Sequence, residues 1–248
     1  MKRFWTEVTV EDGPEGYCLR LDLRPLRTPA RALLVVPTLA LADGIAAEWR
    51  EAGEEFQPRT MVLTGLANAA VDRVAEDPER FVADLARYGE SDLLCYRAEH
   101  PDRLSARQAG SWDPILDWAR RRYDVEFAVT EGVGFVPQPE ATISRLRTTV
   151  AAFDPFRLAG LSPLVTIGGS LVTALGVVEG EFDPEAGWSV VSLEDEWQLE
   201  NWGEDGDARA LLDGDDRGAR DGQATHVAGV ACLVLTADCL PVALLCEG

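Results

Sequence analysis

The stretch A-G-W-S-V-V-S-L-E-D-E-W-Q-L-E-N-W-G, residues 186–203, combines an apolar helical stripe with a row of acids. Asp183 and Pro184 precede it, as an N-cap residue followed by a proline at the first helical position. Apolar side chains then recur at the period of a helix, at Ala186, Val190, Leu193 and Trp197. Because Gly203 supplies a stop signal, we expect one helix over 184–202.

The acids of this predicted helix lie beside the apolar stripe and not opposite it. Glu200 falls almost on the stripe, Glu196 lies next to it, and Glu194 borders its other edge. Glu196 and Glu200 are also i,i+4 neighbours, and two like charges at that spacing cost roughly 0.2–0.5 kcal/mol. Two interpretations stay open: an internal ion pair with an arginine of this chain, or a surface that meets basic or amide groups, within the chain or on a partner.

Trp202 lies well off the stripe that Val190 and Trp197 define. It is therefore expected to pack against a different element or to face a partner. Tryptophan is favoured as an anchor in protein interfaces.

Composition excludes several classes of partner. The chain has 248 residues and a net charge of −20, and its basic residues are scattered among acids, which argues against nucleic acid and anionic membranes as partners. No run of about 18 apolar residues predicts a membrane span. Five cysteines without short pairing spacings, and an N-terminus that lacks signal-peptide or transit-peptide character, predict reduced thiols in a cytoplasmic protein. We expect a monomer when no partner is bound.

The period of the apolar pattern changes near residue 58. Before it, alternating segments predict strands at 4–10, 17–23 and 33–36, followed by a helix that Thr38 caps. After it the pattern is helical, with extended pieces only at 93–97 and 125–129. Helices are expected near 60–74, 78–89, 102–123 (broken at Asp113-Pro114), 139–152, 156–179 (apolar nearly all round, hence central) and 184–202. The fold class is therefore α+β, with a β-rich domain over 1–58, an α-helical domain over 59–205, and an acidic linker with a separate tail over 206–248.

Motifs for catalysis or cofactor binding are missing from the first 220 residues. The sequence has no G-x-x-x-x-G-K-[ST], no G-x-G-x-x-G on a strand-to-helix turn, no H-E-x-x-H and no C-x-x-C. It contains two histidines, too few for the common metal sites. We predict neither a cofactor nor a metal for this part of the chain, and no enzymatic activity.

Several segments together resemble one family, the assembly chaperones of the F-type ATP synthase that bind its alpha subunit. The segments are R-F-W-x-E-V-T-V at 3–10, T-P-A at 28–30, L-x-V-P-T-x-A-L-A at 34–42, A-x-E-W at 46–49, T-M-x-L-T-x-L-A-N at 60–68, D-L-L-C-Y-R-A-E-x-P at 92–101, W-D-P-I-L-D-W-A at 112–119 and S-L-E-D-E-W-Q-x-E-x-W-G at 192–203. The resemblance covers about residues 3–205.

The resemblance implies a small β-rich domain, an α-helical domain and no catalysis. Such a chaperone would keep the new alpha subunit soluble until a beta subunit replaces it, in the bacterial cytoplasm or, for eukaryotic relatives, the mitochondrial matrix. In that family an acidic segment near the end of the helical domain matters for function. By motif match this segment falls on Glu194 and Glu196, and the predicted partner-binding residues are Glu194, Glu196, Trp197, Gln198, Glu200 and Trp202.

The tail departs from this pattern. Residues 222–245, G-Q-A-T-H-V-A-G-V-A-C-L-V-L-T-A-D-C-L-P-V-A-L-L, resemble a fragment of the laccase-domain family, zinc-dependent enzymes with purine nucleoside phosphorylase activity. The resemblance makes Cys239 a metal ligand, but the histidine motifs that would complete the site do not occur here. A catalytic zinc needs three protein ligands. The alternative function is therefore a piece of a zinc enzyme that another chain completes, and otherwise the tail is expected to be poorly ordered or to add a strand edge.

Overall fold

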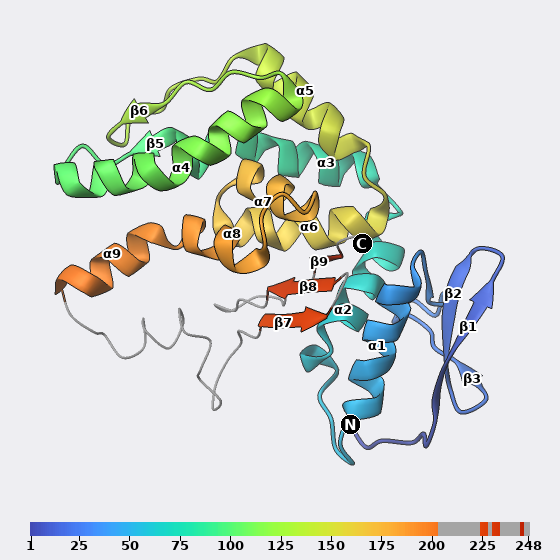
Figure 1. Cartoon of the computed structure of the whole chain (residues 1–248). Coiled ribbons are helices and arrows are strands. Elements are labelled where there is room, and N and C mark those ends of the chain that lie inside the picture. Colours follow the sequence, from blue (N-terminus) through green and yellow to red (C-terminus); the bar gives the residue numbers. More distant parts are fainter. Residues whose placement is uncertain (203–223, 228–229, 234–243, 246–248) are drawn as a thin grey trace.

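The computed structural model describes residues 1–202, 224–227, 230–233 and 244–245. An antiparallel sheet with two helices beside it forms the N-terminal part, and an assembly of helices forms the part that follows (Figure 1). The predicted α+β fold class is confirmed. Within the described residues, no helix is long and apolar enough to span a bilayer.

The N-terminal sheet is organised around a hairpin of β1 (Val8–Gly13) and β2 (Gly16–Leu21). The short strands β3 (Arg24–Pro25) and β4 (Val35–Val36) both pair with β2. The first strand was predicted at 4–10, but it runs from Val8 to Gly13. The turn between β1 and β2 contains only two residues, so the polar residues before the turn still pair with β2. Gly16 permits this tight turn, since its φ of 130° is favourable only for glycine.

Helix α1 (Leu39–Glu51) covers this sheet and begins at the predicted cap. The Thr38 hydroxyl accepts a hydrogen bond from the Leu41 amide at 3.3 Å. The buried residues of α1 fall on one face, at Leu41, Ala42, Ile45 and Ala46. Removing such a face from water is the main stabilising contribution of an amphipathic helix.

Two residues near the end of α1 hold the start of α2 (Val62–Ala69). The Glu48 carboxylate accepts from the amides of Leu63 at 2.6 Å and Thr64 at 2.9 Å, donors that have no partner within their own helix. Trp49 Nε1 donates to the Thr64 hydroxyl at 3.0 Å. Burial raises the pKa of Glu48.

Trp5, in the segment before β1, packs where the end of α1 meets the start of α2, at a corner of the N-terminal part. Its side chain is 4% exposed and contacts the rings of Trp49 and Phe56 with centroids 4.9 and 5.1 Å away. Its indole Nε1 donates to the Trp49 carbonyl at 3.1 Å. The segments quoted at 3–10 and 46–49 therefore meet in space and form one packed unit.

The helical part begins where α2 runs into a π-helical turn, Ala70–Val74. Its other helices are α3 (Pro78–Ala86), α4 (Asp102–Tyr123), α5 (Glu140–Ala151), α6 (Pro155–Gly168), α7 (Leu171–Val178), α8 (Pro184–Val191) and α9 (Leu193–Trp202). The 3-10 turns are Pro58–Thr60, Arg87–Glu90 and Leu93–Cys95. Strands β5 (Tyr96–Arg97) and β6 (Thr130–Glu131) form a short parallel pair beside α4 (Figure 1).

Three of the predicted helices differ from those observed. Helix α4 continues through Pro114, because the loss of one amide donor is offset by buried side chains on both sides, Trp112, Ile115 and Leu116. The helix predicted at 156–179 is two helices, since Gly169 ends α6 in the left-handed conformation and Ser170 caps α7. The helix predicted at 184–202 is also two helices, α8 and α9, which are separated at Ser192. The extended piece predicted at 125–129 contains no strand, and β6 follows it instead.

The most buried element of the helical part is α7, all of whose residues are buried. Asp92, on a distant loop, fixes its start. One carboxylate oxygen accepts from the Val172 amide at 3.0 Å and the other from the Leu94 amide at 3.1 Å. Burial raises the pKa of Asp92 to about 6, against the opposing effect of these hydrogen bonds.

Buried side chains form two clusters. One runs from Trp5 to Ala67 and the other from Ala70 to Leu193, and Phe156 packs against both. The domain boundary predicted after residue 58 stays a prediction, because two cores do not show which parts fold independently. The described parts of the tail are β7 (Ala224–Val227), β8 (Val230–Leu233) and β9 (Leu244–Leu245), which pair antiparallel with one another. Cys239 lies outside the described residues.

Candidate functional site at helix α9

The acidic stretch is divided at Ser192 into α8 and α9. Asp183 caps α8 as predicted, with its carboxylate accepting from the Ala186 amide at 2.7 Å. Ser192 is buried and its hydroxyl donates to the Trp188 carbonyl at 2.8 Å. Its ψ of 2° ends α8, so that α9 starts in a new direction. The prediction of one helix over 184–202 was wrong. The Ser192 amide still donates to the Trp188 carbonyl at 2.9 Å, and the serine hydroxyl adds a second bond to the same carbonyl, a pattern that bends helices.

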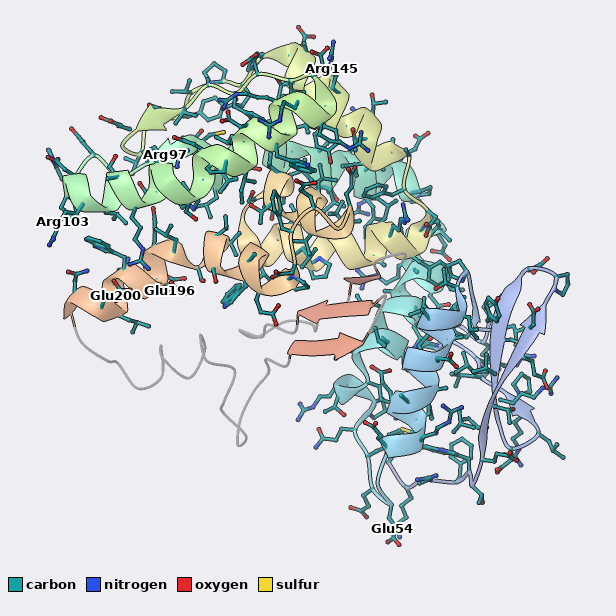
Figure 2. All side chains as sticks on the ribbon, in the orientation of Figure 1. Glu54, Arg97, Arg103, Arg145, Glu196 and Glu200 are labelled. Carbon is teal, nitrogen blue, oxygen red and sulfur yellow. The ribbon has the colours of Figure 1, made fainter. Side chains whose placement is uncertain are left out.

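Helix α9 lies along the N-terminal half of α4 (Figure 1). Leu193 and Leu199 are buried, and Trp197 is partly buried. Figure 2 shows Glu196 and Glu200 on this helix opposite α4. The acids therefore face another element of the same chain.

Arg107 of α4 pairs with both of these acids. Its Nη1 is 2.7 Å from Glu200 Oε2 and its Nη2 is 3.3 Å from Glu196 Oε2. The guanidinium carbon also lies 6.0 Å from the centroid of the Trp197 ring, at the outer limit of a cation–π contact. The internal ion pair, one of the two interpretations left open by the sequence, is present for Glu196 and Glu200.

Glu194 is held differently, by an amide. Gln108 Nε2 donates to Glu194 Oε1 at 2.5 Å, while Gln108 Oε1 accepts from the Ala98 amide at 2.7 Å. Gln108 is fully buried, so its two hydrogen bonds tie α9 to the loop before α4. Glu194 itself makes no ion pair among the described residues.

Water still reaches this network of charges. The side chains of Glu196 and Glu200 are 37% and 52% exposed, and that of Arg107 is 34% exposed. Exposed ion pairs contribute only about 0–1 kcal/mol, because water and salt screen them. A partner cation can therefore compete with Arg107 for these carboxylates at small cost.

A groove of about 840 Å³ runs along the other side of α9. Its walls come from the loop and helix start at 93–104, from Gly132 and Val133 after β6, and from one side of α9. Three of the predicted site residues line it, namely Glu194, Trp197 and Gln198. Glu196 and Glu200 lie outside it with Arg107, and the side chain of Trp202 lies outside the described residues.

Sequence reasoning missed the contribution of α4 and of the loop before it. Gln108 sits four residues before Trp112 on the buried face of α4, and an amide on an apolar stripe is a signal for a buried hydrogen-bond network. Arg107 carried no comparable signal, because nothing local in the sequence distinguishes it from the other arginines. Within the described ranges, no cluster of three or more His, Cys, Asp or Glu side chains is arranged to hold a metal ion.

Comparison with solved structures decides the family. The crystal structure of Atp12 from Paracoccus denitrificans is 40% identical, covers 86% of this chain and 91% of its own, and superposes with a TM-score of 0.81. The chain belongs to the ATP12 chaperone family. The model of the ATP12 chaperone protein family itself matches residues 2–120.

Two further matches agree with this assignment. The Atu1473 structure from Agrobacterium tumefaciens is 40% identical over 85% of this chain and 80% of its own, with a TM-score of 0.81. The mitochondrial protein atp12 of Schizosaccharomyces pombe is 24% identical over 222 residues, which are 85% of this chain and 76% of that protein. The resemblance to ATP synthase assembly chaperones is confirmed, and the zinc-enzyme alternative is not favoured.

Proposed function

We propose that this ATP12-family protein binds the unassembled alpha subunit of the F-type ATP synthase and keeps it soluble until the beta subunit takes its place. Membership of the chaperone family supports an assembly role. The choice of the alpha subunit rests on the family resemblance of the motifs at 3–203. The observation that carries the site is the half-exposed acidic helix α9 beside a groove.

The proposed contact residues are Glu194, Glu196, Trp197, Gln198, Glu200 and Trp202. Helix α9 offers a partner two kinds of group at once. Glu196 and Glu200 form a weak, solvent-accessible network with Arg107, which a basic partner surface can rearrange. Trp197 and Glu194 border the groove and supply an apolar contact beside a charge.

The first test is direct. Purified alpha subunit is diluted from denaturant with and without an equimolar amount of the chaperone, and light scattering is followed. We expect scattering to be suppressed near a one-to-one ratio and a complex to elute in size-exclusion chromatography. Unchanged scattering together with no complex contradicts the proposed function.

The second test compares two neighbouring acids of α9. Glu194 lines the groove, whereas Asp195 is exposed and does not. Glu194→Lys and Asp195→Lys change the net charge equally on the same helix turn. We expect about tenfold weaker binding for Glu194→Lys and less than threefold for Asp195→Lys, with melting temperatures measured for both. Equal losses would mean that only overall charge matters.

A further inference from the structure

The groove beside α9 has an apolar rim that the proposed contact residues do not include. Val133, on the loop after β6, lines the groove and is fully exposed. Phe135, two residues further along this loop, is 66% exposed. Leu93, Leu104 and Trp197 continue the apolar surface inside the groove. Exposed apolar surface of this kind is typical of a binding site.

Two carboxylates without a cationic partner among the described residues lie among these apolar groups. Glu99 and Glu194 line the groove, and neither forms an ion pair with any residue that the structure describes. Among the described residues that line the groove, the arginine is Arg97, which is bound to Asp113 at 2.7 Å and lies over the Trp112 ring, 4.9 Å from its centroid. The groove is therefore acidic in a chain that is already acidic, and it favours a cationic occupant.

Strand β5 adds unused hydrogen-bond donors. The hydroxyl of Tyr96 and Nη1 of Arg97 are buried and have no partner among the described residues. Arg97 is only 6% exposed, and both residues line the groove. Buried donors without acceptors are rare in folded proteins, because leaving them unpaired opposes folding. Both atoms are closed to solvent, so an occupant of the groove does not reach them unless their neighbours are displaced.

We propose that this groove receives an extended, apolar segment of the partner subunit that carries a lysine or arginine. The apolar side chains of the segment pack on Val133, Leu104 and Trp197, and its basic side chain lies by Glu99 and Glu194. A protein segment can also cover the exposed side chain of Val133 at the rim, which a small ligand confined to the groove cannot. The inference rests on the proposed function and specifies which kind of alpha-subunit segment is held.

Crosslinking from the rim tests where the segment lies. The photoreactive amino acid p-benzoylphenylalanine replaces Val133 in one protein and Leu23, an exposed leucine of the N-terminal sheet, in a control. Each protein is irradiated with the alpha subunit, and the crosslinked peptides are identified by mass spectrometry. We expect crosslinks from position 133 into an apolar segment with a Lys or Arg within a few residues, and few from position 23.

Point variants test the chemistry of the groove. Val133→Ser removes rim surface and should weaken binding about tenfold, whereas Leu23→Ser should not. Glu99→Gln should weaken binding about threefold at low salt and less at high salt, and the exposed acid Glu76 provides the control Glu76→Gln.

The outcomes separate the two proposals. If the alpha subunit forms a complex but position 133 gives no crosslink and the groove variants bind normally, the groove inference is wrong and the chaperone function stands. A crosslinked segment that is acidic or strongly polar overturns the inference as well. If no complex forms with the unsubstituted protein, the proposed function fails and the groove inference fails with it.

Discussion

The corner around Trp5 and the surface around Trp197 use similar residues in opposite ways. At the corner, the tryptophan is buried and the Glu48 carboxylate is fully occupied by amides of the same chain. On α9, Trp197 is partly exposed, and Glu196 and Glu200 form ion pairs that water still reaches. Both regions belong to the segments that carry the family resemblance. A motif typical of the family therefore indicates a packed interior in one region and an exposed surface in the other.

The largest expected effect is on the corner tryptophan. Trp5→Ala should lower the free energy of unfolding by about 3–5 kcal/mol, because a buried ring and its hydrogen bond are lost. Trp197→Ala should lower it by about 1 kcal/mol or less and weaken alpha-subunit binding. Urea unfolding and a binding assay on both variants provide the check. Comparable stability losses would show that Trp197 is also a packing residue.

Asp92, a buried carboxylate of the packed interior, makes the stability of the protein depend on pH. Its folded-state pKa of about 6 lies above the ordinary value of 3.8, so its contribution to stability is complete below about pH 4 and is lost as the pH rises to about 6. The change amounts to about 3 kcal/mol at roughly 1.4 kcal/mol per unit. Relative to Asp92→Asn, the natural protein should therefore be less stable at pH 7 than at pH 4. Parallel unfolding curves over this range check it, and a constant difference between the two proteins would contradict it.

Glu48→Ala should have an intermediate effect. The amides of Leu63 and Thr64 lose their acceptor, which costs about 1–3 kcal/mol. Thermal unfolding measures the loss. Glu51, an exposed glutamate on the same helix, gives the matched control Glu51→Ala, which should change stability by no more than about 0.5 kcal/mol.

The smallest effect is expected for the ion pairs of α9. A double-mutant cycle of Arg107→Gln and Glu200→Gln should give a coupling free energy of about 0.2–1 kcal/mol that decreases with salt. Chemical unfolding at two salt concentrations measures it. A coupling of several kcal/mol would mean that Arg107 locks these acids and leaves them unavailable to a partner.

Sequence reasoning reached the α+β class and most helices, because apolar periodicity and caps such as Thr38 and Asp183 are local signals. It failed where a single residue redirects the chain, at Gly169 and at Ser192. It located the acidic helix but not its neighbours. The bonds from Gln108 to Glu194 and from Arg107 to Glu200 span 86 and 93 residues, and periodicity carries no information on such distant pairs.

The break at Ser192 leaves α9 only ten residues long. The stability of an isolated helix of that length is marginal in water, because it forms too few hydrogen bonds to offset the free-energy cost of nucleation. The helical conformation of α9 is therefore stabilised by packing, through the buried side chains of Leu193 and Leu199 and the contacts with Arg107 of α4. In solution the amide protons of α9 should exchange with deuterium sooner than those of the wholly enclosed α7, and a bound client should slow that exchange.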